Sequence, residues 1–148
     1  MDAFDLQIRN HVYAAFVGEG RAQTTDETAA ALELAEDEVA AAYRRLDDAH
    51  ALVLDTGTDE IRMLNPFSAV ETPHRVEAGG RSWFANCAWD ALGIPASLHT
   101  DGSVSSECPD CGEPVELEVR DGELVRGAEL LVHFVVPARR WWDDIAFT

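Results

Sequence analysis

The sequence predicts an α+β fold, in which a winged-helix-like three-helix module precedes a small mixed or antiparallel sheet with one helix. Three early segments carry apolar residues at helical spacing, whereas the second half holds short apolar runs separated by glycine turns. The 148 residues are near the usual size of one domain. We therefore expect a helical module over residues 1–64 and an α+β core over residues 65–148, together forming one compact unit.

Three helices are predicted in the first part of the chain. The first helix carries one apolar face, formed by Leu6, Ile8, Val12, Tyr13, Phe16 and Val17. Gly18 and Gly20 are expected to stop it. Thr24 or Thr25 caps the second helix, with Glu27 placed for a capping box. The third begins within residues 35–38, and its inner face holds Val39, Ala42, Tyr43 and Leu46.

Two short apolar runs, residues 51–55 and 60–64, flank Gly57 and predict a hairpin. Three helices followed by a hairpin is the order of a winged helix, a module that often binds DNA through its third helix. Here that helix offers only Arg44 and Arg45 among acidic neighbours. This favours a scaffold role over DNA binding.

The second half begins with a predicted turn-rich connector over residues 65–80, because prolines and a glycine pair interrupt any periodicity. Residues 82–92 predict a helix that Gly93 and Pro95 terminate, and this helix carries the motif Cys-Ala-Trp-Asp. Cys87 lies on the expected inner face of the helix.

Short strands are predicted at residues 103–108, 115–119 and 124–125. Residues 130–136 are nearly continuous in apolar side chains and predict a central strand, with His133 as a core histidine. The tryptophan pair at residues 141–142 predicts a turn or helix near the end of the sequence.

The chain is strongly acidic, with a formal net charge of −17, and all 11 basic residues are arginine. Such a surface repels phosphate backbones, which argues against nucleic acid partners. A salt-rich, halophilic cytoplasm explains the composition, because salt screens the self-repulsion. An ordinary acidic protein remains the alternative.

The three cysteines cannot all pair within one chain, and no secretory signal opens the sequence. A reducing cytoplasm is therefore expected, with free or metal-bound thiols. No apolar stretch reaches the roughly 20 residues of a membrane span, so no membrane association is predicted.

Cys87 and Asp90 are three residues apart, which on the predicted helix places them on one side. A thiolate holds a soft metal while a carboxylic acid moves a proton, so the pair is a candidate site for both. The alternatives are an inert buried cysteine and a solvated surface acid. Trp89 either helps to shape an apolar substrate pocket or serves in packing.

Cys108 and Cys111 form a Cys-x-x-Cys pair, which is half of a structural zinc site. Cys87 with His99 or His133 offers an irregular second half. A thioredoxin-like redox role requires the pair at a helix start, whereas the residues that follow Cys111 favour a turn.

The central motifs resemble those of the alkylmercury lyases. The matching segments are Asn86-Cys87-Ala88-Trp89-Asp90, Gly93-Ile94-Pro95, Val104-Ser105-Ser106-Glu107-Cys108-Pro109 and Gly112-Glu113-Pro114-Val115. The resemblance covers roughly residues 65–136, and the helical module also fits that family. It implies protonolysis of a carbon–mercury bond in mercury detoxification, releasing a hydrocarbon and Hg(II).

By the same resemblance, Cys87 is the thiolate that takes the organomercurial, Asp90 relays the proton to carbon, and Cys108 is structural. No cofactor is required, and an acceptor similar to mercuric reductase is the implied partner for Hg(II). The family's second catalytic cysteine follows a segment resembling residues 143–147, and this sequence ends at Thr148, about where that cysteine would follow. A truncated chain, substitution by another thiol such as Cys111, and a metal-binding protein or winged-helix metal-responsive regulator without turnover all remain open.

Overall fold

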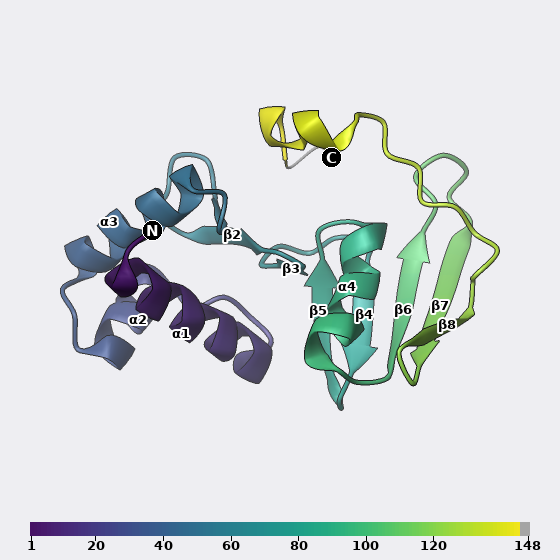
Figure 1. Cartoon of the computed structure of the whole chain (residues 1–148), viewed down its shortest axis with the longest axis horizontal. Coiled ribbons are helices and arrows are strands. Elements are labelled where there is room, and N and C mark those ends of the chain that lie inside the picture. Colours follow the sequence, from purple (N-terminus) through teal and green to yellow (C-terminus); the bar gives the residue numbers. More distant parts are fainter. Residues whose placement is uncertain (146–148) are drawn as a thin grey trace. The chain divides into compact units, whose positions relative to one another are not determined.

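A computed structural model describes residues 1–145 and confirms the α+β fold (Figure 1). The chain divides into two compact units, Met1–Glu71 and Thr72–Thr148. Within the described residues, no helix has both the length and the apolar character needed to cross a bilayer.

The first unit contains the three predicted helices. They are α1 (Ala3–Glu19), α2 (Thr25–Leu32) and α3 (Glu36–Asp48). The helix α1 runs through Gly18 and ends at Glu19, and its C-cap Gly20 adopts the left-handed conformation with φ 78°. At the start of α2, Thr24 and Glu27 form the predicted capping box.

A short antiparallel sheet follows the helices, and it confirms the predicted hairpin. Its strands are β1 (Val53–Leu54), β2 (Ile61–Leu64) and β3 (Phe67–Ser68). The core of this unit consists mainly of Ile8, Val12, Phe16, Tyr43, Leu46, Leu52, Leu64 and Phe67. Within it, the hydroxyls of Tyr43 and Thr28 share a hydrogen bond of 2.8 Å.

Both arginines of α3 are held in ion pairs. Arg44 donates two hydrogen bonds to the carboxylate of Asp59, and Arg45 donates to the buried carboxylate of Asp5, at 2.7 Å from its Nη2. The two cations on which DNA binding by α3 would depend are therefore both paired with carboxylates of this chain. The winged-helix assignment itself stays a prediction.

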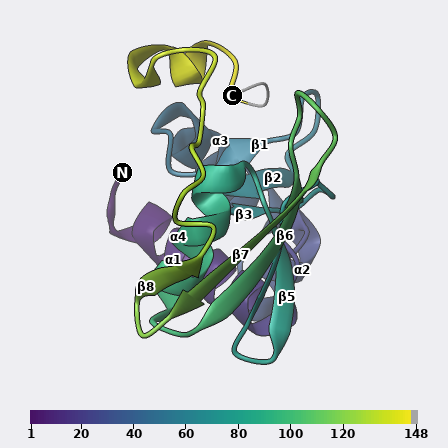
Figure 2. The same cartoon turned by 90° about the vertical axis from the view of Figure 1, so that its right-hand side faces the viewer.

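The second unit is an antiparallel sheet with one helix on its face. Its regular elements are β4 (Arg75–Ala78), β5 (Arg81–Ala85), α4 (Ala88–Leu98), β6 (Gly102–Glu107), β7 (Pro114–Arg120) and β8 (Glu123–Arg126). The strand order is β5-β4-β6-β7-β8. Figure 2 shows α4 against this sheet. Ala91 and Ile94 of α4 are buried, and so are Val76 of β4 and Val104 of β6.

The predicted helix over residues 82–92 is present, but its bounds are wrong, because α4 spans Ala88–Leu98. Gly79 and Gly80, with φ of 55° and 77°, form a two-residue turn that pairs β4 with β5. The chain therefore remains extended to Ala85, and the helix begins only at Ala88. Pro95 lies inside α4 rather than after it.

The predicted connector over residues 65–80 is also wrong in part, because it contains β4. This strand is central in its sheet, since it pairs with β5 on one side and β6 on the other. The alternation of buried Val76 and Ala78 with exposed neighbours is a strand pattern that the prolines and glycines around it obscured.

Residues 130–136 do not form the predicted central strand. The structure gives them irregular backbone, and no strand of the described chain pairs with them. Leu131 is 94% exposed, and His133 is exposed rather than a core histidine. Apolar composition without a pairing partner did not suffice to make a strand. The predicted helix near Trp141 is present as a 3-10 turn, Ala138–Asp143.

Tyr43 provides a test of the first unit. Burial raises the pKa of Tyr43 to about 12. The neutral Tyr43 side chain therefore stabilises the folded state fully below pH 10, and this contribution is lost as the pH rises toward 12. Tyr43→Phe should lower the free energy of unfolding by about 1 kcal/mol at neutral pH, because it removes one buried hydrogen bond. The variant should also lose less stability than the parent chain between pH 10 and 12.

Urea unfolding followed by far-UV circular dichroism measures both effects. Equal stability of the two proteins at neutral pH, or identical alkaline profiles, would contradict this account of the Tyr43 hydroxyl.

Candidate functional site

Cys87 is the N-cap of α4 and not a residue of its inner face. Its backbone is extended, with φ −151° and ψ 176°, and its Sγ accepts the backbone N–H of Asp90 at 3.5 Å. A helix N-terminus carries unpaired N–H groups and a partial positive charge, which suit a thiolate. The sequence places the thiol there because β5 ends at Ala85 and only two residues separate it from α4.

Asp90 is the third residue of α4, and its carboxyl lies in hydrogen-bond contact with the thiol of Cys87. Asn86 Nδ2 donates to Asp90 Oδ2 at 3.2 Å. The predicted closeness of Cys87 and Asp90 is therefore present, but it arises from capping geometry and not from one turn of continuous helix. Asn86 had no predicted role, although its spacing of four residues from Asp90 is visible in the sequence.

Both groups have raised pKa values. Burial, reinforced by the nearby carboxylate of Asp90, raises the pKa of the Cys87 thiol above its usual range. Burial likewise raises the pKa of Asp90, while hydrogen bonds from Asn86 and Cys87 act in the opposite direction. Both shifts favour the protonated form of each group, so the arrangement suits the transfer of a proton between sulfur and carboxylate.

Hydrogen bonds to the end of β5 fix the position of this pair. The backbone N–H of Ala85 donates to the carbonyl of His74 at 2.9 Å, and Thr72 Oγ1 donates to the carbonyl of Ala85 at 2.6 Å. The ring Nδ1 of His74 lies 2.7 Å from Ser106 Oγ, and burial lowers the pKa of His74. The neutral histidine thus links the strand that leads to Cys87 with the end of β6.

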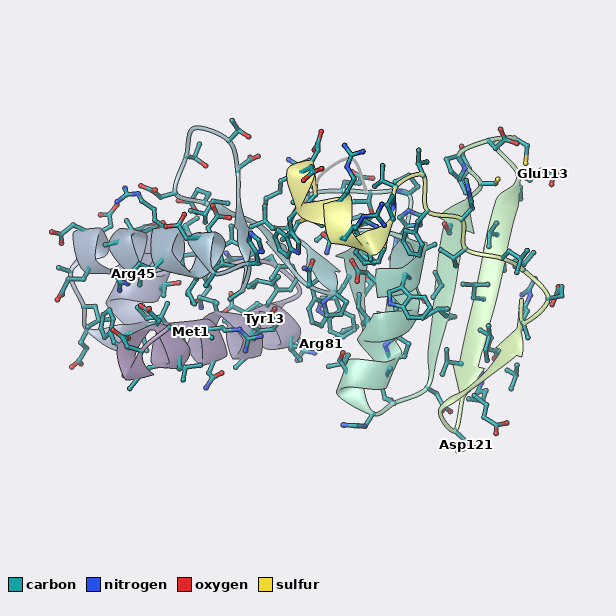
Figure 3. All side chains as sticks on the ribbon, turned by 45° about the horizontal axis from the view of Figure 1, so that its top comes forward. Met1, Tyr13, Arg45, Arg81, Glu113 and Asp121 are labelled. Carbon is teal, nitrogen blue, oxygen red and sulfur yellow. The ribbon has the colours of Figure 1, made fainter. Side chains whose placement is uncertain are left out.

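Cys108 and Cys111 lie in the turn between β6 and β7, which Figure 3 marks by Glu113. The N–H of Gly112 donates to the carbonyl of Cys108 at 2.8 Å, and Gly112 has φ 72°. Backbone N–H groups of Cys111 and Asp110 point at Cys108 Sγ and lower the pKa of that thiol. All three cysteines are free.

The predicted residues therefore fall into two groups: Cys87 with Asp90, and Cys108 with Cys111. Trp89 is 60% exposed, which leaves its role in a substrate pocket a prediction. Among residues 1–145, no three His, Cys, Asp or Glu side chains come together as a metal site. The predicted zinc ligand set with His99 or His133 is thus not assembled there.

A hollow of about 580 Å³ lies at the opposite end of the sheet, lined by the β4–β5 turn together with Arg81 and Arg120. It contains none of the cysteines, so its size does not make it the reactive site. The matched segment at residues 143–147 is only partly described, because residues 146–148 lie outside the described residues.

Comparison with known proteins gives one consistent result. The family described as MerB, alkylmercury lyase, matches residues 67–148. Alkylmercury lyases of Bacillus cereus and Clostridium butyricum are each 34% identical to this chain over 56 residues, and that of Staphylococcus epidermidis is 38% identical over the same length. These matches cover 38% of this chain and 26% of each relative, so the similarity spans about a quarter of their length.

A solved structure shares the fold. The crystal structure of the mercury-bound form of MerB2 matches with a TM-score of 0.68 and 24% sequence identity. The match covers 85% of this chain and 60% of that chain.

The pKa of the Cys87 thiol is raised and that of the Cys108 thiol is lowered, and this difference can be tested directly. Near neutral pH, iodoacetamide should alkylate Cys108 faster than Cys87, because only the thiolate reacts. Asp90→Asn should accelerate alkylation of Cys87, since it removes the negative charge that opposes thiolate formation. Peptide mass spectrometry over time and pH measures both rates.

The rate at Cys108 serves as the internal control and should not change in Asp90→Asn. If Cys87 reacts as fast as Cys108, or if its rate is the same in the variant, the described pairing of thiol and carboxyl is incorrect.

Proposed function

The chain belongs to the alkylmercury lyase family, and from this premise we propose that it cleaves carbon–mercury bonds by protonolysis, releasing a hydrocarbon and Hg(II). The hydrogen-bonded pair of Cys87 and Asp90 is the observation that carries the proposal. A soft thiolate and a proton donor stand together at one helix terminus, which is what the reaction requires.

Capture of the substrate begins at Cys87. Mercury bonds to its sulfur and releases the anion or small thiolate that it carried, while the thiol proton passes to the carboxylate of Asp90, so no free thiolate has to form in the buried site. The N–H of Asp90 and the terminus of α4 stabilise the negative charge that develops on sulfur during this transfer.

Cleavage then uses the same proton. The carboxylic acid of Asp90 protonates the carbon bound to mercury, the carbon–mercury bond breaks, and the electron pair of that bond forms the new C–H bond. Asp90 returns to the carboxylate, and Hg(II) stays on the sulfur of Cys87. Electron donation from sulfur increases the basicity of the carbon, which assists the transfer.

The product needs an acceptor. A mercuric ion on one thiolate exchanges readily onto further thiols, so we propose that Hg(II) leaves with small cellular thiols or with a protein acceptor similar to mercuric reductase. A chain that binds mercury without turnover is the second candidate. The Cys108–Cys111 pair, whose first thiol follows Cys87 by 21 residues, favours it over a DNA-binding regulator.

Cleavage can be tested with phenylmercury and excess small thiol. The chain should release benzene, measured in the headspace by gas chromatography, and Cys87→Ser and Asp90→Asn should each reduce the rate by about a hundredfold or more. Asp121→Asn is the matched control, because Asp121 lies in the β7–β8 turn with φ 51°, a conformation that asparagine tolerates well.

The control should release benzene at the parental rate. Parental release from both site variants would refute the proposal, and mercury retention without benzene from the parent chain would favour the binding protein.

The pH profile tests the role of Asn86. The reactive pair needs the carboxylate of Asp90 to accept the thiol proton, so activity should rise as pH passes the pKa of Asp90. Asn86→Leu removes the hydrogen bond that lowers this pKa. The rising limb of the profile should therefore move to higher pH, while the rate on the plateau changes less than in Asp90→Asn.

Benzene release measured across the acidic range gives the position of this limb. An unchanged limb with a lower plateau would mean that Asn86 acts only on local structure.

A further inference from the structure

We propose that Cys108 and Cys111 form a second mercury site, which chelates Hg(II) after the ion has left Cys87. That Hg(II) comes from Cys87 rests on the proposed function, whereas the binding of Hg(II) to Cys108 and Cys111 does not. The shape of the turn, the number of donors in it and its place in the sheet all favour such a site.

The turn Cys108-Pro109-Asp110-Cys111-Gly112 already holds its two sulfurs together. Cys108 Sγ accepts the backbone N–H groups of Asp110 and Cys111, and the thiol of Cys111 also donates to it. The hydrogen bond from the N–H of Gly112 to the carbonyl of Cys108 closes the turn, and Cys108 donates its own N–H to the carbonyl of Glu113 at 2.9 Å. A dithiol held in this way loses little conformational entropy on chelation.

The number of donors selects the ion. A structural zinc ion takes four ligands, and the described chain brings no third His, Cys, Asp or Glu to this pair. Hg(II) is soft and is satisfied by two thiolates. Cys111 is exposed and Cys108 is partly exposed, so a small complex of mercury can reach both sulfurs from solvent.

The sheet register places the Cys108–Gly112 turn at the same end of the strands as Cys87. Arg75 of β4 pairs with Phe84 of β5 on one side and with Ser105 of β6 on the other. Cys87 and Cys108 each lie three residues beyond those partners. Because one strand, β4, lies between β5 and β6, the backbones that lead to Cys87 and to Cys108 are separated by roughly 10 Å, twice the usual strand spacing. Figure 1 shows the start of α4 and the β6–β7 turn at the same end of this unit.

The exchange is balanced without any redox change. Hg(II) leaves Cys87 as a complex with two low-molecular-weight thiolates. The thiolate of Cys108 bonds to mercury as one small thiolate departs, and Cys111 then bonds as the second departs and takes the proton that the Cys111 thiol loses. Two Hg–S bonds break and two form, and the gain comes from the high effective concentration of the second protein thiol.

The test uses mercuric chloride on the reduced protein in the Cys87→Ser background, so that neither cleavage nor the first site contributes. In about a tenfold excess of free cysteine, native mass spectrometry should show one Hg per chain with the loss of two protons. Adding Cys108→Ser or Cys111→Ser should abolish retention in each case. Adding Asp121→Asn is the matched control and should preserve it, because Asp121 lies in the β7–β8 turn, outside the Cys108–Gly112 turn, and the substitution leaves both thiols and both backbone donors in place.

Circular dichroism should confirm that every variant is folded. The proposal is overturned if the parent retains no mercury, if either single-cysteine variant retains as much as the parent, or if one ion bridges two chains. Mercury retention with no benzene from the Cys87-containing chain would instead overturn the proposed cleavage and leave this site intact.

Discussion

The contact between the thiol of Cys87 and the carboxyl of Asp90 is the interaction on which the chemistry proposed for this chain depends. Each group alone would be poorly suited to its task, because burial disfavours both the thiolate and the carboxylate. Together they hold one proton and one negative charge, which the start of α4 stabilises. In the proposed mechanism, the same proton first leaves the sulfur and later completes a C–H bond.

The sheet makes this contact possible at a distance from its own core. Val76 of β4 and Val104 of β6 are fully buried, and α4 packs over them through Ala91 and Ile94. The packed face fixes where α4 begins, and the hydrogen bonds of Ala85 fix where β5 ends. The loop between them is so short that Asn86 and Cys87 have little freedom, which supports a preorganised pair.

Much of this arrangement was predictable from local sequence signals. The capping box at Thr24 and the hairpin around Gly57 depend on short-range chemistry, and both were predicted correctly. The family motif also identified Cys87 and Asp90 as the residues to consider.

The boundary between β5 and α4 was not predicted, because Trp83 and Phe84 suit a helix as well as a strand, and only the pairing with β4 decides between them. The link from His74 to Ser106 joins residues 32 apart and depends on strand register, which no local pattern reveals. The strand prediction for residues 130–136 was wrong for the opposite reason: their composition favours a strand, but no described strand pairs with them.

The N-cap position of Cys87 couples ligand capture to the integrity of a helix. A thiolate bound to a metal carries more negative charge on sulfur than the neutral thiol, so in the proposed mechanism the capped sulfur becomes a better acceptor for the N–H of Asp90 when mercury binds. Thermodynamic linkage makes this effect reciprocal, and any contact that tightens the first turn of α4 raises the affinity of the sulfur for its ligand by the same free energy. Transfer of the bound ion to another thiol therefore also weakens a helix cap.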